Sequence, residues 1–179
     1  MSRIACKRFH PGWGKFPSLV AALLALSCGL LRAQTQVSND FTKLYYATLQ
    51  AAVDATTNNY AVYLMADLTN APVVITNKTN LYISTAPSYV GGGSKAFLFG
   101  NSAVAIGMDI SNCGPVVVDS VRFGAWAGVA ALRQQSSSGA ISNCEFVSNA
   151  QNGLFITNAH FNMVFGCYAA TNNFDGIGV

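Results

Sequence analysis

Few residues of this chain could do acid–base chemistry, and their spacing limits what they could do. The 179 residues include seven Asp and Glu. Asp109 is the best candidate for an outward-facing carboxylate on a strand. The corresponding places of later units offer no second carboxylate: Ala130, Phe155 and Gly178. Because hydrolytic acid–base chemistry commonly uses paired carboxylates, Asp109 indicates a contact with a ligand rather than a complete catalytic site.

A second group of charged residues lies further along the chain. Asp119 and Glu145 fall close to one shared repeat position, and Arg122 lies near both. Such a trio is typical of a solvated surface ion cluster. His160 lies in a predicted turn without a metal-ligand partner nearby. No Ser-His-Asp set, phosphate-binding glycine loop or metal spacing is present, so the sequence identifies no catalytic residue and no cofactor.

The element that must position these residues is a repeat, seen most clearly over residues 140–179. GAISNCEFVSNAQNGLFI and NMVFGCYAATNNFDGIGV align as two copies, each aligned pair 23 residues apart. The matched pairs are Ile141 with Val164, Cys144 with Cys167, Phe146 with Ala169, Asn149 with Asn172 and Asn152 with Asp175. A fixed period in the low twenties predicts a solenoid, in which each repeat is one turn of a coil.

Two matched pairs predict stacks of like side chains inside this coil. Asn149 and Asn172 would form a short asparagine ladder, with amides bonded to each other and to turn backbone; the alternative is two ordinary surface turn residues. Cys144 and Cys167 would be two buried thiols about 4.8 Å apart on neighbouring strands. A disulfide between them remains an alternative, although directly stacked strand positions suit its geometry poorly.

The rest of the chain extends the same interpretation towards the N-terminus. Residues 34–59 form a polar start followed by a helix over Phe41–Thr57, with helical spacing of its apolar residues; this helix is expected to cap the coil. Residues 60–179 form the coils, each with two strand-like runs such as AISNCEF and GLFI, and Ala86–Lys95 is a glycine-rich loop. The Asn spacing also fits a leucine-rich repeat, but the positions are not leucine-rich.

The first 33 residues are typical of a secretory signal peptide. A basic leader precedes the apolar run LVAALLALSCGLL, and Ala33 is a suitable residue for cleavage. Lipidation at Cys28 or a retained anchor are the alternatives. Removal of residues 1–33 leaves five basic and seven acidic residues, a net charge of −2. The mature chain then carries no basic patch for nucleic acid and no membrane segment, and is expected to be secreted, periplasmic or on the cell surface.

These units resemble a known family. LQAAVDA before the first strand, followed by NCEFVSNAQNGLFI and GCYAATNNFDGIGV, is similar to the right-handed parallel β-helix family, the pectate-lyase-like superfamily. The resemblance implies an all-β, right-handed coil of roughly 23-residue turns that binds or processes extracellular polysaccharide. An enzyme of this family would be a polysaccharide lyase or a glycoside hydrolase, and some members use Ca²⁺. The alternative is a non-catalytic, adhesin-like solenoid.

The same resemblance gives the candidate ligand contacts their chemistry. Trp126 and Asp109 are the candidate glycan contacts. The rings of Trp126, Tyr168 and Phe155 could stack on sugars if exposed, and packing inside the coil is the alternative, since aromatic residues commonly fill coil interiors. Because Val179 lies inside a strand with no capping segment after it, we also expect the chain to be the N-terminal part of a longer protein.

Overall fold

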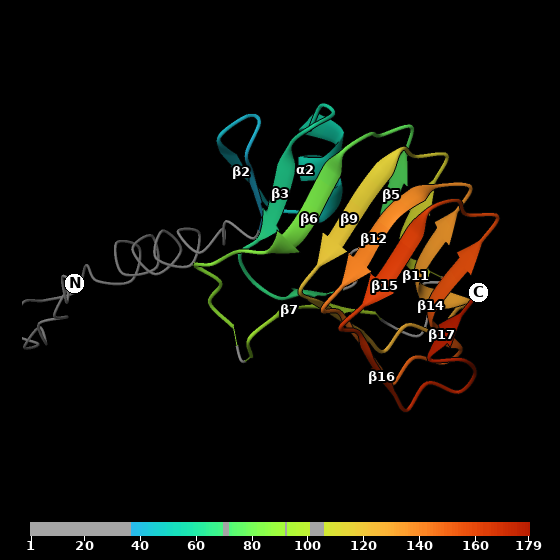
Figure 1. The fold of residues 1–179 in the computed structure, drawn as a ribbon. Helices are drawn as coiled ribbons and strands as arrows, with labels where there is room; N and C mark the ends of the chain where they lie inside the picture. The colour runs from blue at the N-terminus through green and yellow to red at the C-terminus, as the bar shows by residue number, and fades with distance from the viewer. Residues whose placement is uncertain (1–36, 70–71, 92, 101–105) are drawn as a thin grey trace, which may run out of the picture. The chain divides into compact units, whose positions relative to one another are not determined.

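The protein is a coil of short parallel strands, seen in a computed structural model that describes residues 37–69, 72–91, 93–100 and 106–179 (Figure 1). The predicted signal peptide lies outside the described residues. The coil makes about five turns, mostly of about 23 residues, with a longer step of 35 residues where Leu81 pairs with Val116, and this confirms the predicted all-β parallel solenoid. The expected period appears directly in the strand register, where Ile141 lies opposite Val164 and Phe146 opposite Ala169.

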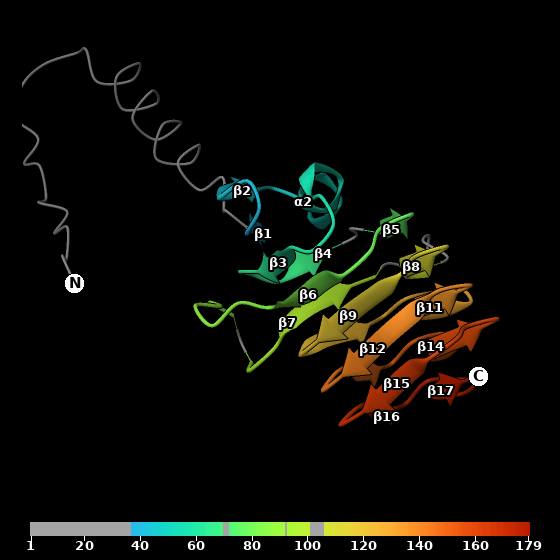
Figure 2. The same ribbon diagram turned by 45° about the horizontal axis from the view of Figure 1, so that its top comes forward.

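Each turn contributes one strand to each of three sheets (Figure 2). Turn 1 contains β3 (Ala61–Leu64), β4 (Leu68–Thr69) and β5 (Val73–Thr76). Turn 2 contains β6 (Leu81–Thr85), β7 (Ala96–Phe99) and β8 (Ile106–Ser111). Turn 3 contains β9 (Pro115–Asp119), β10 (Val121–Gly124) and β11 (Ala130–Gln135). Turn 4 contains β12 (Ser138–Ser142), β13 (Glu145–Val147) and β14 (Asn152–Thr157). Turn 5 contains β15 (Asn162–Phe165), β16 (Tyr168–Ala170) and β17 (Ile177–Gly178).

The three sheets follow from this order. Sheet A has the order β15-β12-β9-β6-β3 and continues into β1 (Val37–Asn39) and β2 (Leu44–Tyr46). Sheet B has the order β16-β13-β10-β7-β4, and sheet C the order β17-β14-β11-β8-β5. A leucine-rich repeat would place a helix or an irregular convex segment where sheet C lies, so that alternative is excluded for the described turns.

The run AISNCEF is two strands rather than the one expected, because a single residue bends the chain between sheets A and B. Asn143 takes a left-handed conformation with φ of 51° and separates β12 from β13. Ser120 and Gly166 occupy the same corner in turns 3 and 5, with φ of 55° and 62°. Asparagine and glycine tolerate this conformation better than other residues, so the corner is favoured locally in turns 4 and 5, whereas Ser120 gives turn 3 no such preference.

Apolar side chains in inward-facing rows fill the coil. In sheet B the row is Leu98, Phe123 and Phe146, all at most 1% exposed, followed by Ala169. The rings of Phe123 and Phe146 stack with their centroids 5.4 Å apart. Since each ring is covered by residues of the turns above and below, burial depends on stacking of turns rather than on any single unit.

The expected helix over Phe41–Thr57 is much shorter in the structure. Helix α2 spans Leu49–Ala55, and β1 and β2 form an antiparallel hairpin before it. The Thr48 hydroxyl accepts the Ala51 amide over 3.2 Å and caps the helix. The hairpin forms because Asn39 Oδ1 accepts the amide of Phe41 over 2.8 Å in the turn, and because aromatic residues favour strands.

The glycine-rich loop lies where the sequence places it, between β6 and β7. Its ends are tied to turn 1, since the Val90 amide donates to the Met65 carbonyl oxygen over 3.1 Å. The Tyr89 hydroxyl donates to the Asp67 carboxylate, which also accepts the Phe97 amide over 2.8 Å. Burial and the hydrogen bond to Asp67 raise the pKa of Tyr89 to about 12. Tyr89 therefore stays protonated and anchors the loop.

Candidate functional site

The predicted contact Asp109 lies on the outer face of sheet C, opposite a cation that the sequence alignment missed. Arg133 Nε and Nη2 donate to the two carboxylate oxygens of Asp109 over 2.9 and 2.6 Å. The hydrogen bonds from Arg133 to Asp109 raise the pKa of that arginine. Ala130 was the expected equivalent, but it lies opposite Ile106. The repeat between β8 and β11 is 24 residues, whereas equating Asp109 with Ala130 requires 21, so that predicted equivalence was wrong.

The predicted trio of Asp119, Glu145 and Arg122 is divided between two sheets. Glu145 lies on sheet B and contacts Lys95 Nζ at 2.7 Å and Arg122 Nε at 3.5 Å. Asp119 lies on sheet A, and none of its hydrogen bonds comes from Arg122. Lys95 was not predicted as a partner of Glu145, because it lies 50 residues earlier in the chain. Only the stacking of turns brings the two side chains together.

Neutral donors surround Asp119 on the outer face of sheet A. Its Oδ1 accepts from Ser142 Oγ at 2.6 Å and Asn143 Nδ2 at 2.9 Å. Its Oδ2 accepts from Ser120 Oγ at 3.0 Å and from the Tyr82 hydroxyl at 3.2 Å. Partial burial opposes ionisation, but these hydrogen bonds outweigh it and hold the pKa of Asp119 below its usual value. A carboxylate with a lowered pKa and occupied lone pairs is a poor general base.

Trp126, the other predicted contact, lies in the core. Its side chain is 1% exposed, and the indole N–H donates to the Leu98 carbonyl oxygen over 3.1 Å. The prediction of a stacking surface at Trp126 is corrected on that ground, since both polar and apolar parts of the ring are used internally. Tyr168 is 61% exposed on sheet B, and Phe155 is half-buried on sheet C.

The outer surface of sheet B gathers aromatic and charged groups in one place. We call it the sheet B face and define it by its outward residues Phe97, Phe99, Arg122, Glu145 and Tyr168. Phe97, Arg122, Glu145 and Tyr168 follow one another in a single row, one residue per turn. The Arg122 guanidinium carbon lies 4.7 Å from the centre of the Phe97 ring, and that ring contacts Phe99.

Gly124, which has no side chain, leaves room for the Phe97 ring on the outer face of sheet B. A Cβ on Gly124 would come within 2.8 Å of that ring. The face could have been found from the sequence, since AFLFG alternates with both phenylalanines on one side and Leu98 on the other.

A groove borders the sheet B face where the chain leaves sheet B. We call it the corner groove; its volume is about 540 Å³. It is lined by Gly100, Ala125, Trp126, Ala127, Ser148, Asn149, Ala150, Thr171 and Asn173. Three of these, Ala125, Ser148 and Thr171, occupy the same corner of successive turns with positive φ. The groove therefore runs along the coil, and small side chains keep its floor open.

Asn149 and Asn172 lie under the corner groove and bond to each other. The side-chain Nδ2 and the backbone N–H of Asn149 both donate to Asn172 Oδ1, over 2.8 and 3.1 Å respectively. Asn149 Oδ1 accepts the Trp126 amide over 3.2 Å, and Asn172 Nδ2 donates to the Phe146 carbonyl oxygen over 3.0 Å. Asn149 is 2% exposed, so these side chains replace backbone partners inside the stack.

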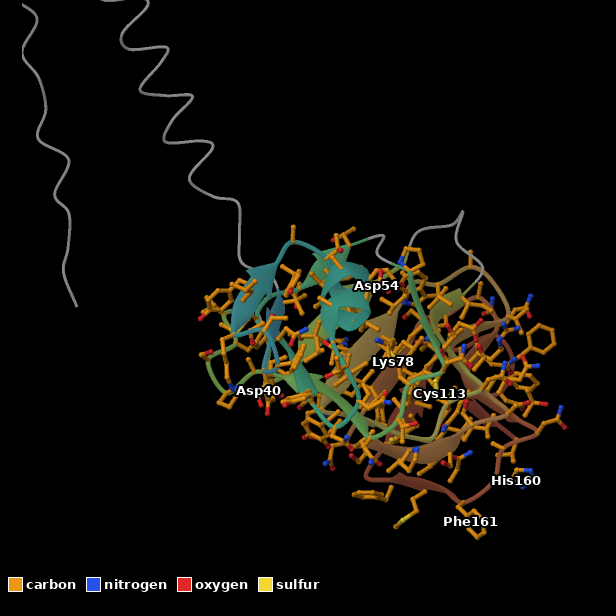
Figure 3. The ribbon with its side chains drawn as sticks, turned by 90° about the horizontal axis from the view of Figure 1, so that it is seen from above. Asp40, Asp54, Lys78, Cys113, His160 and Phe161 are labelled. Carbon is orange, nitrogen blue, oxygen red and sulfur yellow. The ribbon has the colours of Figure 1, made fainter. Side chains whose placement is uncertain are left out.

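The remaining predicted positions lie outside the sheet B face and the corner groove. Cys144 is buried, Cys167 is half-buried, and both are free thiols. His160 is exposed, and Figure 3 shows it beside Phe161 at the outer edge of the molecule. Within the described residues no three His, Cys, Asp or Glu side chains gather as metal ligands. The same residues include no helix with the length and hydropathy needed to cross a bilayer.

Comparisons of the chain with protein-family models, with curated proteins and with solved structures found no match. The functional inference therefore depends on the geometry of the sheet B face and the corner groove.

Proposed function

We propose that this chain is a secreted, right-handed parallel β-helix protein that binds extracellular polysaccharide through the sheet B face and the corner groove. The observation that carries the proposal is the row of Phe97, Arg122, Glu145 and Tyr168 on one outward surface. The pyranose ring has an apolar C–H face that packs on aromatic rings, and its hydroxyl groups bond to charged side chains at the rim.

The direction of the groove favours a chain-like ligand. The row of the sheet B face and the corner groove both run along the coil, crossing one strand or corner per turn. An extended polymer lying along this axis meets a new polar group at each turn, for example the hydroxyls of Ser148 and Thr171, which lie 3.0 Å apart. A compact ligand would use only part of that surface.

The hydrogen bonds and ion pairs of the outward carboxylates favour a binding role over a catalytic one. Asp109, Asp119 and Glu145 each accept hydrogen bonds or ion pairs from residues of the same chain. None of the three is a free base beside a second carboxylate. This supports a binding role for the described turns, and it also favours the second candidate, a non-catalytic cell-surface solenoid of the adhesin type. A lyase or hydrolase would place its catalytic groups elsewhere.

The proposal includes a cap at the N-terminal end of the coil. Gln50 on α2 donates to the Val74 carbonyl oxygen over 3.0 Å and accepts the Val74 amide over 2.7 Å. Its side-chain amide thus takes the place of a neighbouring strand at the edge of sheet C. Leu49, Ala52 and Val53 of the same helix are buried. Together these contacts protect an edge that would otherwise be open to pairing.

The test is affinity electrophoresis and calorimetry of the mature protein with uronic-acid polymers and with neutral polysaccharides. We expect binding to at least one polymer, and about tenfold weaker binding after Tyr168→Ala or Phe97→Ala, since tenfold corresponds to about 1.4 kcal/mol. Phe161→Ala is the matched control, because Phe161 is 95% exposed and lies away from sheet B. Circular dichroism would verify that each variant is folded.

Three outcomes would overturn the proposal. The first is no binding to any polymer, which would leave the non-catalytic solenoid without a glycan ligand. The second is equal weakening by Phe161→Ala, which would remove the sheet B face from the site. The third is release of reducing ends or of ultraviolet-absorbing unsaturated products, which would show turnover instead of binding alone.

A further inference from the structure

Two thiols occupy the same place in turns 4 and 5, at the corner between sheets A and B. Cys144 directly precedes β13 and Cys167 directly precedes β16, in the register that places Glu145 opposite Tyr168. The Tyr168 amide donates to the Cys144 carbonyl oxygen over 2.9 Å. Neighbouring strands lie about 4.8 Å apart, inside the range of about 4.4 to 6.8 Å found for Cα atoms of disulfides. The backbone therefore holds the two residues at a bridging distance.

The two side chains make equivalent contacts one turn apart, since the Cys144 Sγ lies 3.5 Å from the Val118 carbonyl oxygen and the Cys167 Sγ lies 3.4 Å from the Ile141 carbonyl oxygen. Cys144 is fully buried and Cys167 is half-buried. The neighbouring Cys144 thiol lowers the pKa of Cys167, while the Cys167 thiol and burial raise the pKa of Cys144. Cys167, the more exposed sulfur, is thus the one that carries the thiolate and reacts first.

The third free cysteine lies elsewhere in the turn and serves as an internal control. Cys113 follows β8 at the corner between sheets C and A, where its Sγ lies 3.5 Å from the Ile75 carbonyl oxygen. Figure 3 shows it near Lys78. Burial raises the pKa of Cys113. It is therefore a buried, unreactive thiol at a different position of the repeat.

We propose that Cys144 and Cys167 form a reversible disulfide when the protein meets hydrogen peroxide. The Cys167 thiolate attacks one peroxide oxygen, the O–O bond breaks, and the displaced hydroxide takes a proton to leave as water. The Cys144 sulfur then attacks the sulfenic sulfur of Cys167, and the hydroxide that leaves takes the Cys144 proton. The two thiols lose two electrons, and the peroxide gains them as it becomes two waters.

The bond would add a covalent cross-link between two turns that are otherwise joined only by the chain between β14 and β15 and by non-covalent contacts. Its formation requires the two sulfur atoms to close to about 2.05 Å. The bridge fixes β16 to β13 at the corner where sheet A passes into sheet B. We therefore expect slower amide exchange in β15 and β16 of the oxidised protein, with little change in β9 and β10 of turn 3.

Peptide mapping tests this inference independently of any glycan ligand. The reduced mature protein is treated with hydrogen peroxide, and remaining thiols are alkylated. Trypsin cleaves after Arg122 and Arg133, so Cys113 falls in the peptide 96–122 and the pair falls together in 134–179. We expect the 134–179 peptide to lose two hydrogens and to escape alkylation, while the 96–122 peptide is alkylated. Cleavage after Glu145 must then leave two fragments joined until dithiothreitol separates them.

Several outcomes would overturn the inference. These are alkylation of both cysteines after peroxide, a linkage from Cys113 to either of them, a disulfide between two protein molecules, or stable sulfinic acid at Cys167. Cys144→Ser supports the mechanism if a sulfenic acid then accumulates at Cys167 and reacts with dimedone. Cys113→Ser should leave the wild-type result unchanged. The wild-type peptide map decides the matter even if a variant fails to fold.

Discussion

At the scale of single residues, the charged groups of this protein are mostly used within it. Asp109 bonds to Arg133 at 2.6 Å, and Glu145 contacts Lys95 at 2.7 Å. Both acids were visible in the sequence, but their partners were not, because each pair joins different turns. A partner that lies one or two turns away depends on loop insertions that change the repeat length, as the 24-residue step from Asp109 to Arg133 shows.

Asp119 makes the stability of the protein depend on pH. Its pKa is lowered in the folded state, so its contribution is present above the unfolded value of 3.8 and is lost as the pH falls through the folded value. We expect Asp119→Asn to lower the free energy of unfolding at pH 7 and to differ less from wild type at pH 3. Urea unfolding at both pH values measures the difference in free energy of unfolding. Asp175→Asn, at an exposed position, is the control.

A constant difference between the Asp119→Asn variant and wild type from pH 7 to pH 3 would contradict this account of the Asp119 hydrogen bonds.

Asn149 links three turns through its side chain, so its removal should be costly. Asn149→Ala would leave the buried backbone N–H of Trp126 without its acceptor, while Asn172 Oδ1 would keep only the backbone N–H of residue 149. Leaving buried polar groups unpaired costs about 1 to 3 kcal/mol each, and we expect a loss of about that size in chemical denaturation. Asn173→Ala is the matched control, since its side chain is exposed. Equal effects of the two substitutions would show that Asn149 acts as a plain turn residue.

At the scale of elements, the N-terminal segment shows how local preference and tertiary context compete. Helical spacing over Phe41–Thr57 suggested one helix, yet only LQAAVDA is helical. Residues 44–46 form a strand instead of a helix because β1 pairs with β3 on one side and with β2 on the other. The turn at Asn39 then breaks the helical register. Periodicity alone does not distinguish these outcomes over such a short segment.

Gln50 should protect the edge of sheet C. We predict that Gln50→Ala speeds amide exchange at Val74, whose N–H loses its 2.7 Å acceptor, and lowers the free energy of unfolding by about 0.5 to 1.5 kcal/mol, the usual net value of a hydrogen bond. Hydrogen exchange followed by NMR measures the effect at single residues. Ala51→Ser, an exposed position on the same helix, is the control.

Unchanged protection at Val74 in the Gln50→Ala variant would show that the helix does not serve as an edge cap.

At the scale of the whole molecule, the coil brings together residues that no local pattern relates. Phe97 and Tyr168 are 71 positions apart in numbering and share one outward row. The same stacking buries Trp126 under the neighbouring turns and exposes Tyr168. Which aromatic residue faces a ligand is therefore decided by the alternation of each strand and by the register between turns, both of which are properties of the assembled sheets.

The sequence by itself determined the solenoid. The 23-residue spacing, the alternation within strands and the left-handed residues at the corners are local properties, and each repeat carries them in its own residues. The tertiary structure decided what lies outside and inside: the Asp109–Arg133 pair, the core position of Trp126 and the sheet B face. The physical reason is that burial and pairing arise only when turns stack, and residues inserted in a loop change the sequence spacing of the partners on either side of that loop, from 23 for Ile141 and Val164 to 35 for Leu81 and Val116.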